Sequence, residues 1–239
     1  MSKIKIEDIR EELKKDNWKL ISDTYVNLEA ELIFECPEGH RVYSSWKKIR
    51  TQRTCPICQN NPLKNIDTKV IPKEKGITRI LALDQATRIT GWSIYDEKEL
   101  IKYGLFETSL DDEIARDHAI KEWVINMINT WQIDIVGIEG IQYQQNMGVT
   151  TFEMLARLQG ILLNTIYELK IPYKICPTNT WRAHCKVKGR TRSDKKASMQ
   201  LLAKQWFDIS VTDDEADAIG IGKYIADTCT KEVKIENWE

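Results

Sequence analysis

The fold is decided by residues 78–95, which read Thr78-Arg-Ile-Leu-Ala-Leu-Asp-Gln-Ala-Thr-Arg-Ile-Thr-Gly-Trp-Ser-Ile-Tyr95. Residues 78–84 predict a buried strand that ends in an acid, and residues 91–95 predict a second strand after a short turn. Gly91 and Trp92 fit a hairpin that returns the chain beside Asp84. The stretch therefore predicts a pair of strands with a carboxylate at its end.

The sequence around this hairpin alternates strands and helices. Further strands are predicted over 100–107, 133–139 and 173–176, and helices over 112–131, 151–169, 194–206 and 213–226. The helix over 112–131 is expected to bury one apolar face, formed by Ile114, Ile120, Val124, Met127 and Ile128. Strands that are first adjacent and then alternate with helices indicate a mixed α/β domain.

The N-terminal part has a different pattern of predicted helices and strands. A short amphipathic helix is predicted over 5–15, and alternating residues within 18–35 predict short strands. The stretch 59–76 has two prolines, paired asparagines and no clean period, which is typical of a linker. We expect an N-terminal domain over 1–65, a linker over 66–76 and a second domain over 77–239.

Composition and charge exclude some classes of protein. The 239 residues are 42% hydrophobic and 30% charged, which is ordinary for a globular protein. No apolar run approaches the ~20 residues of a membrane span, and no signal peptide opens the chain, so we expect no membrane partner and a cytoplasmic protein of a bacterium or a phage-infected cell. The net charge is −1, yet residues 41–76 hold nine Lys and Arg against two acids, and residues 213–239 hold eight acids against three lysines. This asymmetry suggests a basic contact surface separated from an acidic site.

Four metal-ligating residues cluster in the N-terminal part. Cys36-Pro-Glu-Gly-His40 and Cys55-Pro-Ile-Cys58 are separated by 14 residues and together supply the four ligands of a tetrahedral zinc ion. A closed shell of four protein ligands favours one structural Zn²⁺ over a catalytic one, and a domain of this size needs such support to fold. The alternative is that three cysteines and a histidine share a small core by chance.

Two segments carry basic residues that could contact DNA phosphates. Between the cysteine pairs lie Lys47, Lys48, Arg50 and Arg53. The second basic segment is residues 181–196, which are predicted to form a loop that leads into a helix. It contains Arg182, Lys186, Lys188, Arg190, Arg192, Lys195 and Lys196. Tyr143 could stack on a base. For the basic residues the alternative is a solvated charged face, and for Tyr143 it is ordinary packing.

A set of acids is spread over the second domain. Asp84 and Glu139 each end a predicted strand, while Asp214 and Asp217 are three residues apart and share one face of a helix. Gathered carboxylates repel one another unless a cation lies between them, and oxygen ligands favour Mg²⁺ or Mn²⁺. Two such ions can activate water for attack on a phosphodiester. Each acid taken alone could equally be a turn or cap residue.

The pieces Ala82-Leu-Asp84-x6-Gly91-Trp-Ser, Ile138-Glu139 and Asp214-Glu-Ala-Asp217-Ala resemble the RuvC-like branch of the ribonuclease H-like nucleases, the Holliday junction resolvases. The resemblance implies a mixed five-stranded sheet flanked by helices and a homodimer that cuts branched DNA. It further implies two Mg²⁺ or Mn²⁺ ions per active site, held by Asp84, Glu139, Asp214 and Asp217, with Asp213 as an alternative to Asp214. Lys195 or Lys196 would be the active-site lysine. The N-terminal part resembles treble-clef zinc fingers attached to phage and mobile-element nucleases.

The sequence thus predicts a metal-dependent, structure-selective endonuclease that resolves Holliday junctions by two-metal hydrolysis. One alternative is a broader branched-DNA or flap endonuclease, and another is a DNA-binding adaptor without activity. A third is an actin-like or sugar-kinase-like ATPase, which would need a Gly-rich adenosine loop late in the chain. The segment Asp214-Glu-Ala-Asp217 occupies the place in the sequence where that loop would be expected, which disfavours the ATPase.

Overall fold

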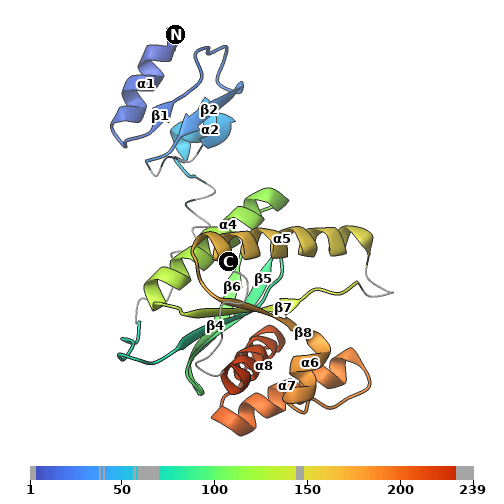
Figure 1. Ribbon diagram of the computed structural model, residues 1–239. Coiled ribbons are helices and arrows are strands. Elements are labelled where there is room, and N and C mark those ends of the chain that lie inside the picture. Colours follow the sequence, from blue (N-terminus) through green and yellow to red (C-terminus); the bar gives the residue numbers. More distant parts are fainter. Residues whose placement is uncertain are drawn as a thin grey trace. The chain divides into compact units, whose positions relative to one another are not determined.

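The computed structural model describes residues 4–37, 39, 41–55, 58, 70–143 and 148–229. Contacts divide the chain into two compact units, Met1–Asn61 and Pro62–Glu239, which are described separately (Figure 1). Of the predicted linker, residues 66–69 lie outside the described residues. Val70 already packs against the core of the second unit, and the carbonyl of Ile71 accepts a hydrogen bond from the Arg79 guanidinium at 2.9 Å.

Within its described residues, the first unit contains a small sheet and helices α1 and α2. Helix α1 (Ile6–Lys14) precedes three antiparallel strands in the order β1 (Lys19–Leu20), β2 (Glu31–Glu35) and β3 (Arg41–Ser45), and α2 (Trp46–Thr51) follows. Their apolar side chains form one core, made of Ile9, Leu13, Trp18, Leu20, Leu32, Phe34, Cys36, Val42, Trp46, Ile49 and Cys55. Helix α2 was not predicted, because its six residues are too few to show a helical period.

The second unit is built on a five-stranded mixed sheet, as predicted. Its strands are β4 (Arg79–Asp84), β5 (Ile89–Asp96), β6 (Glu99–Glu107), β7 (Ile135–Gly140) and β8 (Tyr173–Pro177), in the spatial order β6-β5-β4-β7-β8. The β4–β5 hairpin pairs Asp84 with Gly91, which confirms the predicted return of the chain. Strands β7 and β8 run parallel to β4.

Helices cover both faces of this sheet (Figure 1). Helices α4 (Glu113–Trp131) and α5 (Val149–Glu168) lie on one face, and α6 (Thr178–His184), α7 (Arg192–Phe207) and α8 (Asp213–Thr228) lie on the other. The side chains of β4 alternate between the two cores: Leu81 and Leu83 pack with α4 and α5, whereas Ile80 and Ala82 pack with α6, α7 and α8.

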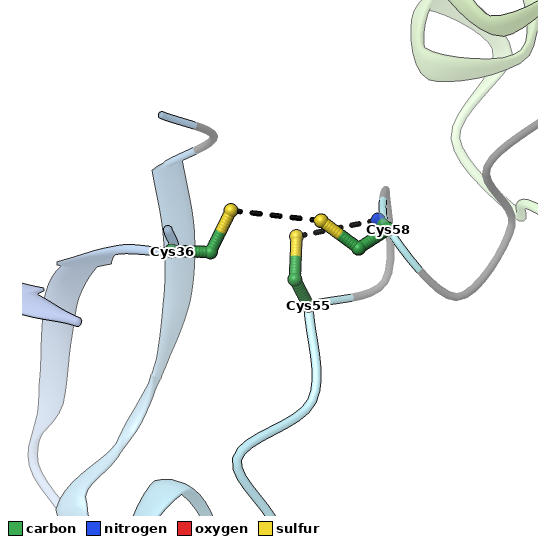
Figure 2. A group of neighbouring side chains, drawn as sticks. All are labelled: Cys36, Cys55 and Cys58. Carbon is green, nitrogen blue, oxygen red and sulfur yellow. Dashed lines mark hydrogen bonds between the residues drawn. The ribbon is translucent and has the colours of Figure 1, made fainter. Parts of the chain in front are cut away.

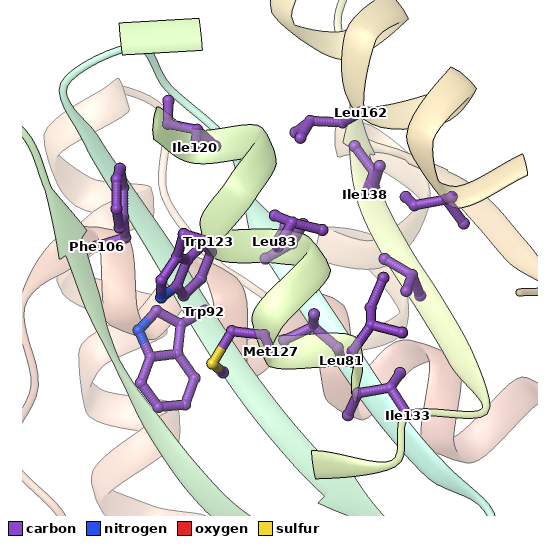
Figure 3. Packing of buried hydrophobic residues seen from close by; sticks show 14 of the residues in the cluster. Leu81, Leu83, Trp92, Phe106, Ile120, Trp123, Met127, Ile133, Ile138 and Leu162 are labelled. Carbon is purple, nitrogen blue, oxygen red and sulfur yellow. The ribbon is translucent and has the colours of Figure 1, made fainter. Parts of the chain in front are cut away.

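Aromatic residues fill much of the core under α4 and α5 (Figure 3). The Trp123 ring lies 5.0 Å from that of Phe106 and 6.2 Å from that of Trp92, measured between centroids. These rings tie α4 to β5 and β6, since aromatic side chains bury large apolar areas. The sheet that carries the predicted acids is therefore packed against α4 and α5 on this face.

Two predictions about the helices were wrong. Ile114 was expected in the buried face of α4, but it lies in the first turn, is 60% exposed and contributes nothing to the core. The segment 181–196 is not one loop, because residues 181–184 belong to α6 and residues 192–196 to the first turns of α7. Helix α7 begins earlier than expected because Thr191 caps it and forms a capping box with Asp194.

Candidate active site and cysteine cluster

Asp84 and Glu139 come together because two parallel strands end side by side. The register pairs Leu83 of β4 with Ile138 of β7, so the next residue of each strand is an acid. On the other side of β7, Glu139 is in register with Cys176 of β8, after which the chain enters α6. The carboxyl ends of β4, β7 and β8 thus share one edge of the sheet.

The remaining acids are delivered by the first turn of α8. Thr212 caps this helix and forms a capping box with Glu215, which fixes where the helix starts. Asp214 and Asp217 follow three residues apart on one face. Helix α8 approaches β5 so closely that a Cβ on Gly91 would lie 2.0 Å from the carbonyl oxygen of Asp214. Only glycine permits this contact, which holds the start of α8 beside Asp84.

The electrostatics show that the four acids form one cluster. Burial raises the pKa of Asp84 well above its usual range, and the negative charges of Glu139, Asp217 and Asp214 raise it further. Asp217 is 5% exposed, and its pKa is raised to about 6, first by burial and then by the charge of Glu139, against the opposing effect of Arg182. Both carboxyl groups are therefore harder to ionise than a carboxyl group in water.

Two cations accompany the cluster. Arg182 of α6 donates to Asp217 at 2.9 Å, while Lys196 of α7 lies 3.1 Å from Asp213 and 3.5 Å from Asp214. Burial would lower the pKa of Lys196, but the hydrogen bond to Asp213 and the charges of the nearby acids outweigh it and raise the pKa. Of the two lysines considered, Lys196 is the one that contacts the acids, and Lys195 makes no ion pair with a described residue.

Glu139 has uncharged partners that the sequence did not reveal. The Trp181 indole Nε1 donates to Glu139 Oε1 at 2.9 Å. The side-chain amides of Gln85 and Gln159 both donate to the Glu139 carbonyl oxygen, each at 2.8 Å. These residues come from the β4–β5 turn, α5 and α6, so no spacing within the sequence could have grouped them.

The other predicted DNA-binding residues of this unit lie outside the acidic cluster. Four exposed basic residues follow or start the helices beside it: Lys186, Lys188, Arg190 and Arg192. Arg192 lines an open pocket of about 520 Å³ together with Lys196, Gln200 and Asp213. Tyr143 is 57% exposed, and its ring meets that of Phe152 edge-on at 5.5 Å.

In the first unit, three of the four predicted zinc ligands converge (Figure 2). The sulfur atoms of Cys36, Cys55 and Cys58 all lie within 4.8 Å of one another. The Cys58 backbone N–H donates to Cys55 Sγ at 3.4 Å, and burial together with the neighbouring sulfurs raises the pKa of Cys58 to about 12. His40, the predicted fourth ligand, lies outside the described residues.

The basic residues of the first unit are not equivalent. Arg53 is held inside the unit by ion pairs to Glu12 and Asp16, and Lys47 pairs with Glu29 at 2.8 Å. Lys48 and Arg50 are exposed and make no ion pair with any residue that the structure describes. Of the four, these two are the residues open to an outside partner.

Comparison with known proteins bears on the second unit. Residues 80–223 match the family model described as Crossover junction endodeoxyribonuclease RuvC. Two solved structures share the fold: Thermus thermophilus RuvC in complex with a Holliday junction substrate (13% identity, TM-score 0.53, 62% of this chain and 92% of that chain) and Thermus thermophilus RuvC (16% identity, TM-score 0.50, 62% and 93%). No curated protein matches the sequence significantly.

These matches confirm the predicted ribonuclease H-like α/β fold. Among the described residues, no helix is long and apolar enough to span a membrane. The family match covers more than half of the chain, including strands β5 to β8, all of β4 except Arg79, and the four acids. The chain belongs to the RuvC family of crossover junction endodeoxyribonucleases.

Proposed function

We propose that this protein resolves four-way DNA junctions by hydrolysing phosphodiester bonds at the cluster of Asp84, Glu139, Asp214 and Asp217. The observation that carries the proposal is the grouping of these carboxylates at one edge of the sheet, where burial first and then their mutual repulsion raise the pKa of Asp84 and Asp217. A fold gains no stability from such repulsion, so the arrangement points to a functional site.

The cluster fits the divalent ions that the family implies. Its donors are carboxylate oxygens, the ligands preferred by Mg²⁺ and Mn²⁺, and two cationic side chains face the four acids. The four carboxylates outnumber these two cations by two, so negative charge remains for divalent metal to offset. When bound, such ions lower the pKa of water and offset charge that develops on phosphate oxygens.

The residues around the cluster have separate tasks. Asp84 and Glu139 would hold the metal from strand ends, and Asp214 and Asp217 would hold it from α8. The Lys196 ammonium reaches into the cluster, 3.5 Å from Asp214, and would contact the scissile phosphate there. Lys186, Lys188, Arg190 and Arg192 would then bind the phosphates that flank the cut.

Cleavage of matched substrates tests this proposal. A labelled four-way junction, a flap and a linear duplex of the same sequence would be incubated with the protein in Mg²⁺. The proposal predicts paired, symmetric nicks in the junction and little cutting of the other two. Equal cutting of the flap would support a broader branched-DNA nuclease, and binding without any cutting would support an adaptor.

We also propose that the first unit is a zinc-stabilised, treble-clef DNA-binding domain over 1–65, joined to the nuclease domain over 77–239 by the linker 66–76. The convergence of Cys36, Cys55 and Cys58 supports a tetrahedral site that His40 would complete. Of the four residues of this unit predicted to contact DNA, Lys48 and Arg50 are the ones that are exposed and form no ion pair with a described residue.

Cys55→Ser is expected to remove zinc and unfold the first unit. A small core with a structural metal loses most of its stability without it. Metal analysis should find about one zinc per chain in the wild type and close to none in the variant. Cys229→Ser is the control, because Cys229 is the C-cap residue of α8 in the second unit, and this variant should keep its zinc. Full zinc content in Cys55→Ser would contradict the proposed site.

We further propose that two copies of the chain act together, as symmetric cutting of a junction requires two sites. Exposed apolar side chains on α4 and α5, namely Ile114, Val149 and Tyr167, support a contact between copies. Light scattering of the purified protein should give twice the chain mass of 27.8 kDa. A monomer that still makes paired nicks would contradict this part.

A further inference from the structure

The hydrogen bond from Trp181 to Glu139 differs in kind from the contacts of the other acids. Arg182 and Lys196 are cations, so they neutralise Asp217 and Asp214 and compete with a divalent ion for their oxygens. An indole N–H is an uncharged group that donates a hydrogen bond and cannot accept one. Its bond, at 2.9 Å, is made to Oε1, and Oε2 makes no hydrogen bond with a described residue, so that oxygen is available to a metal.

Trp181 is itself held in one place. Its side chain is fully buried and belongs to the core under α6, α7 and α8. It packs so closely on α8 that a Cβ at Gly220 would lie 2.7 Å from its ring. Because Gly220 is three residues beyond Asp217, the same ring contacts the helix that carries two of the acids and bonds to a third acid on β7.

The main chain of Glu139 is fixed as well. Gln85 and Gln159 approach its carbonyl oxygen from the β4–β5 turn and from α5, and each donates at 2.8 Å. Gln85 is 6% exposed, so this bond is not exchanged with water. Glu139 is thereby held at its carbonyl and at its carboxylate, by residues from three elements.

We infer that Trp181, supported by Gln85 and Gln159, is the positioning residue for Glu139 and sets the affinity of the cluster for divalent metal. The inference rests on the proposed function. Groups that orient a metal ligand commonly change metal affinity or activity by about 10–100-fold when they are removed. A glutamate has a long side chain, and without its anchor it would spread over several rotamers.

The test compares Trp181→Phe with Trp131→Phe. Both changes shrink a fully buried tryptophan to phenylalanine in the same domain, but the Trp131 indole nitrogen has no hydrogen-bond partner among the described residues. Mn²⁺ binding by the full chain without DNA would be followed by electron paramagnetic resonance of the free ion, and unfolding by calorimetry. Trp181→Phe should weaken Mn²⁺ binding about 10–100-fold, and Trp131→Phe should leave it unchanged at a comparable loss of melting temperature.

Cleavage gives a second readout. In Trp181→Phe the Mg²⁺ concentration for half-maximal cutting should rise by a similar factor, with activity recovering at high Mg²⁺, while junction binding without added Mg²⁺ stays as in the wild type. Equal Mn²⁺ affinity in both phenylalanine variants would overturn the inference. A wild type that binds Mn²⁺ but cuts no DNA would refute the proposed function and not this inference, which the Mn²⁺ comparison would still decide.

A pair of alanine variants on α5 covers the case in which Trp181→Phe does not fold. Gln159→Ala removes one donor to the Glu139 carbonyl, at a helix position where alanine is a good helix former. Asn164→Ala removes a side-chain amide from the same helix, where it donates to Glu168 at 3.0 Å and not to Glu139. Only Gln159→Ala should weaken Mn²⁺ binding, and equal affinities in the two alanine variants would overturn the inference.

Discussion

Asp84→Asn is expected to lower junction cleavage by on the order of 10³-fold while leaving junction binding intact. The change keeps the size of the side chain but removes the charge that the other acids and the metal share. Loss of a metal ligand forfeits several kcal/mol of transition-state stabilisation, and about 4 kcal/mol corresponds to this factor. Gel-shift titration without added Mg²⁺ and single-turnover cleavage in Mg²⁺ measure the two quantities separately.

The same variant should be more stable than the wild type in EDTA. Burial and three neighbouring carboxylates disfavour the charged form of Asp84 in the folded protein, and asparagine removes that cost. Asp208→Asn is the control, since Asp208 is exposed at φ 54°, where asparagine is readily accepted. It should change neither cleavage nor melting temperature. Near-normal cleavage by Asp84→Asn would remove Asp84 from the site.

Gly91→Ala is expected to damage both stability and cleavage. The new Cβ would lie 2.0 Å from the carbonyl oxygen and 2.5 Å from the carbonyl carbon of Asp214, and main-chain atoms cannot turn away as a side chain can. The first turn of α8 must move, carrying Asp214 and Asp217 with it. We expect a loss of about 1–3 kcal/mol in the free energy of unfolding and about 10²-fold in cleavage, the cost of an ångström of misplacement.

Gly160→Ala provides the matched control for this substitution. Gly160 lies in α5, and a Cβ there meets no atom within 4 Å. Alanine should therefore stabilise the helix by about 1 kcal/mol. Urea unfolding of both variants gives the comparison. Wild-type stability and cleavage in Gly91→Ala would show that α8 does not depend on this close approach.

The sequence predicted those parts of the molecule that leave a regular pattern in a short window. Asp84 and Gly91 could be paired because an apolar run, a turn and a second apolar run follow one another directly. Asp214 and Asp217 were grouped because three residues on a helix bring side chains to one face. The predicted burial of Ile114 was wrong because the spacing of apolar residues does not show whether the first turn of a helix reaches the core.

Other features depend on contacts between distant segments. Helix α6 has seven residues, too few for a periodic signal, and was predicted as part of a loop. The bond from Trp181 to Glu139 spans 42 residues and exists because β8 places α6 beside the end of β7. Arg182, which was predicted to contact DNA, forms an ion pair with Asp217 at 2.9 Å, and the two residues are 35 positions apart in the sequence.

The most direct test of the account is single-turnover cleavage of an end-labelled four-way junction by the wild type in Mg²⁺, beside Asp84→Asn. The wild type is expected to make symmetric nicks in two opposing strands, and EDTA should abolish them. The rate of cleavage should be lower on the order of 10³-fold in the variant. A junction that is bound by both proteins and cut by neither, or cut equally by both, would contradict the assignment of this acidic cluster as a nuclease centre.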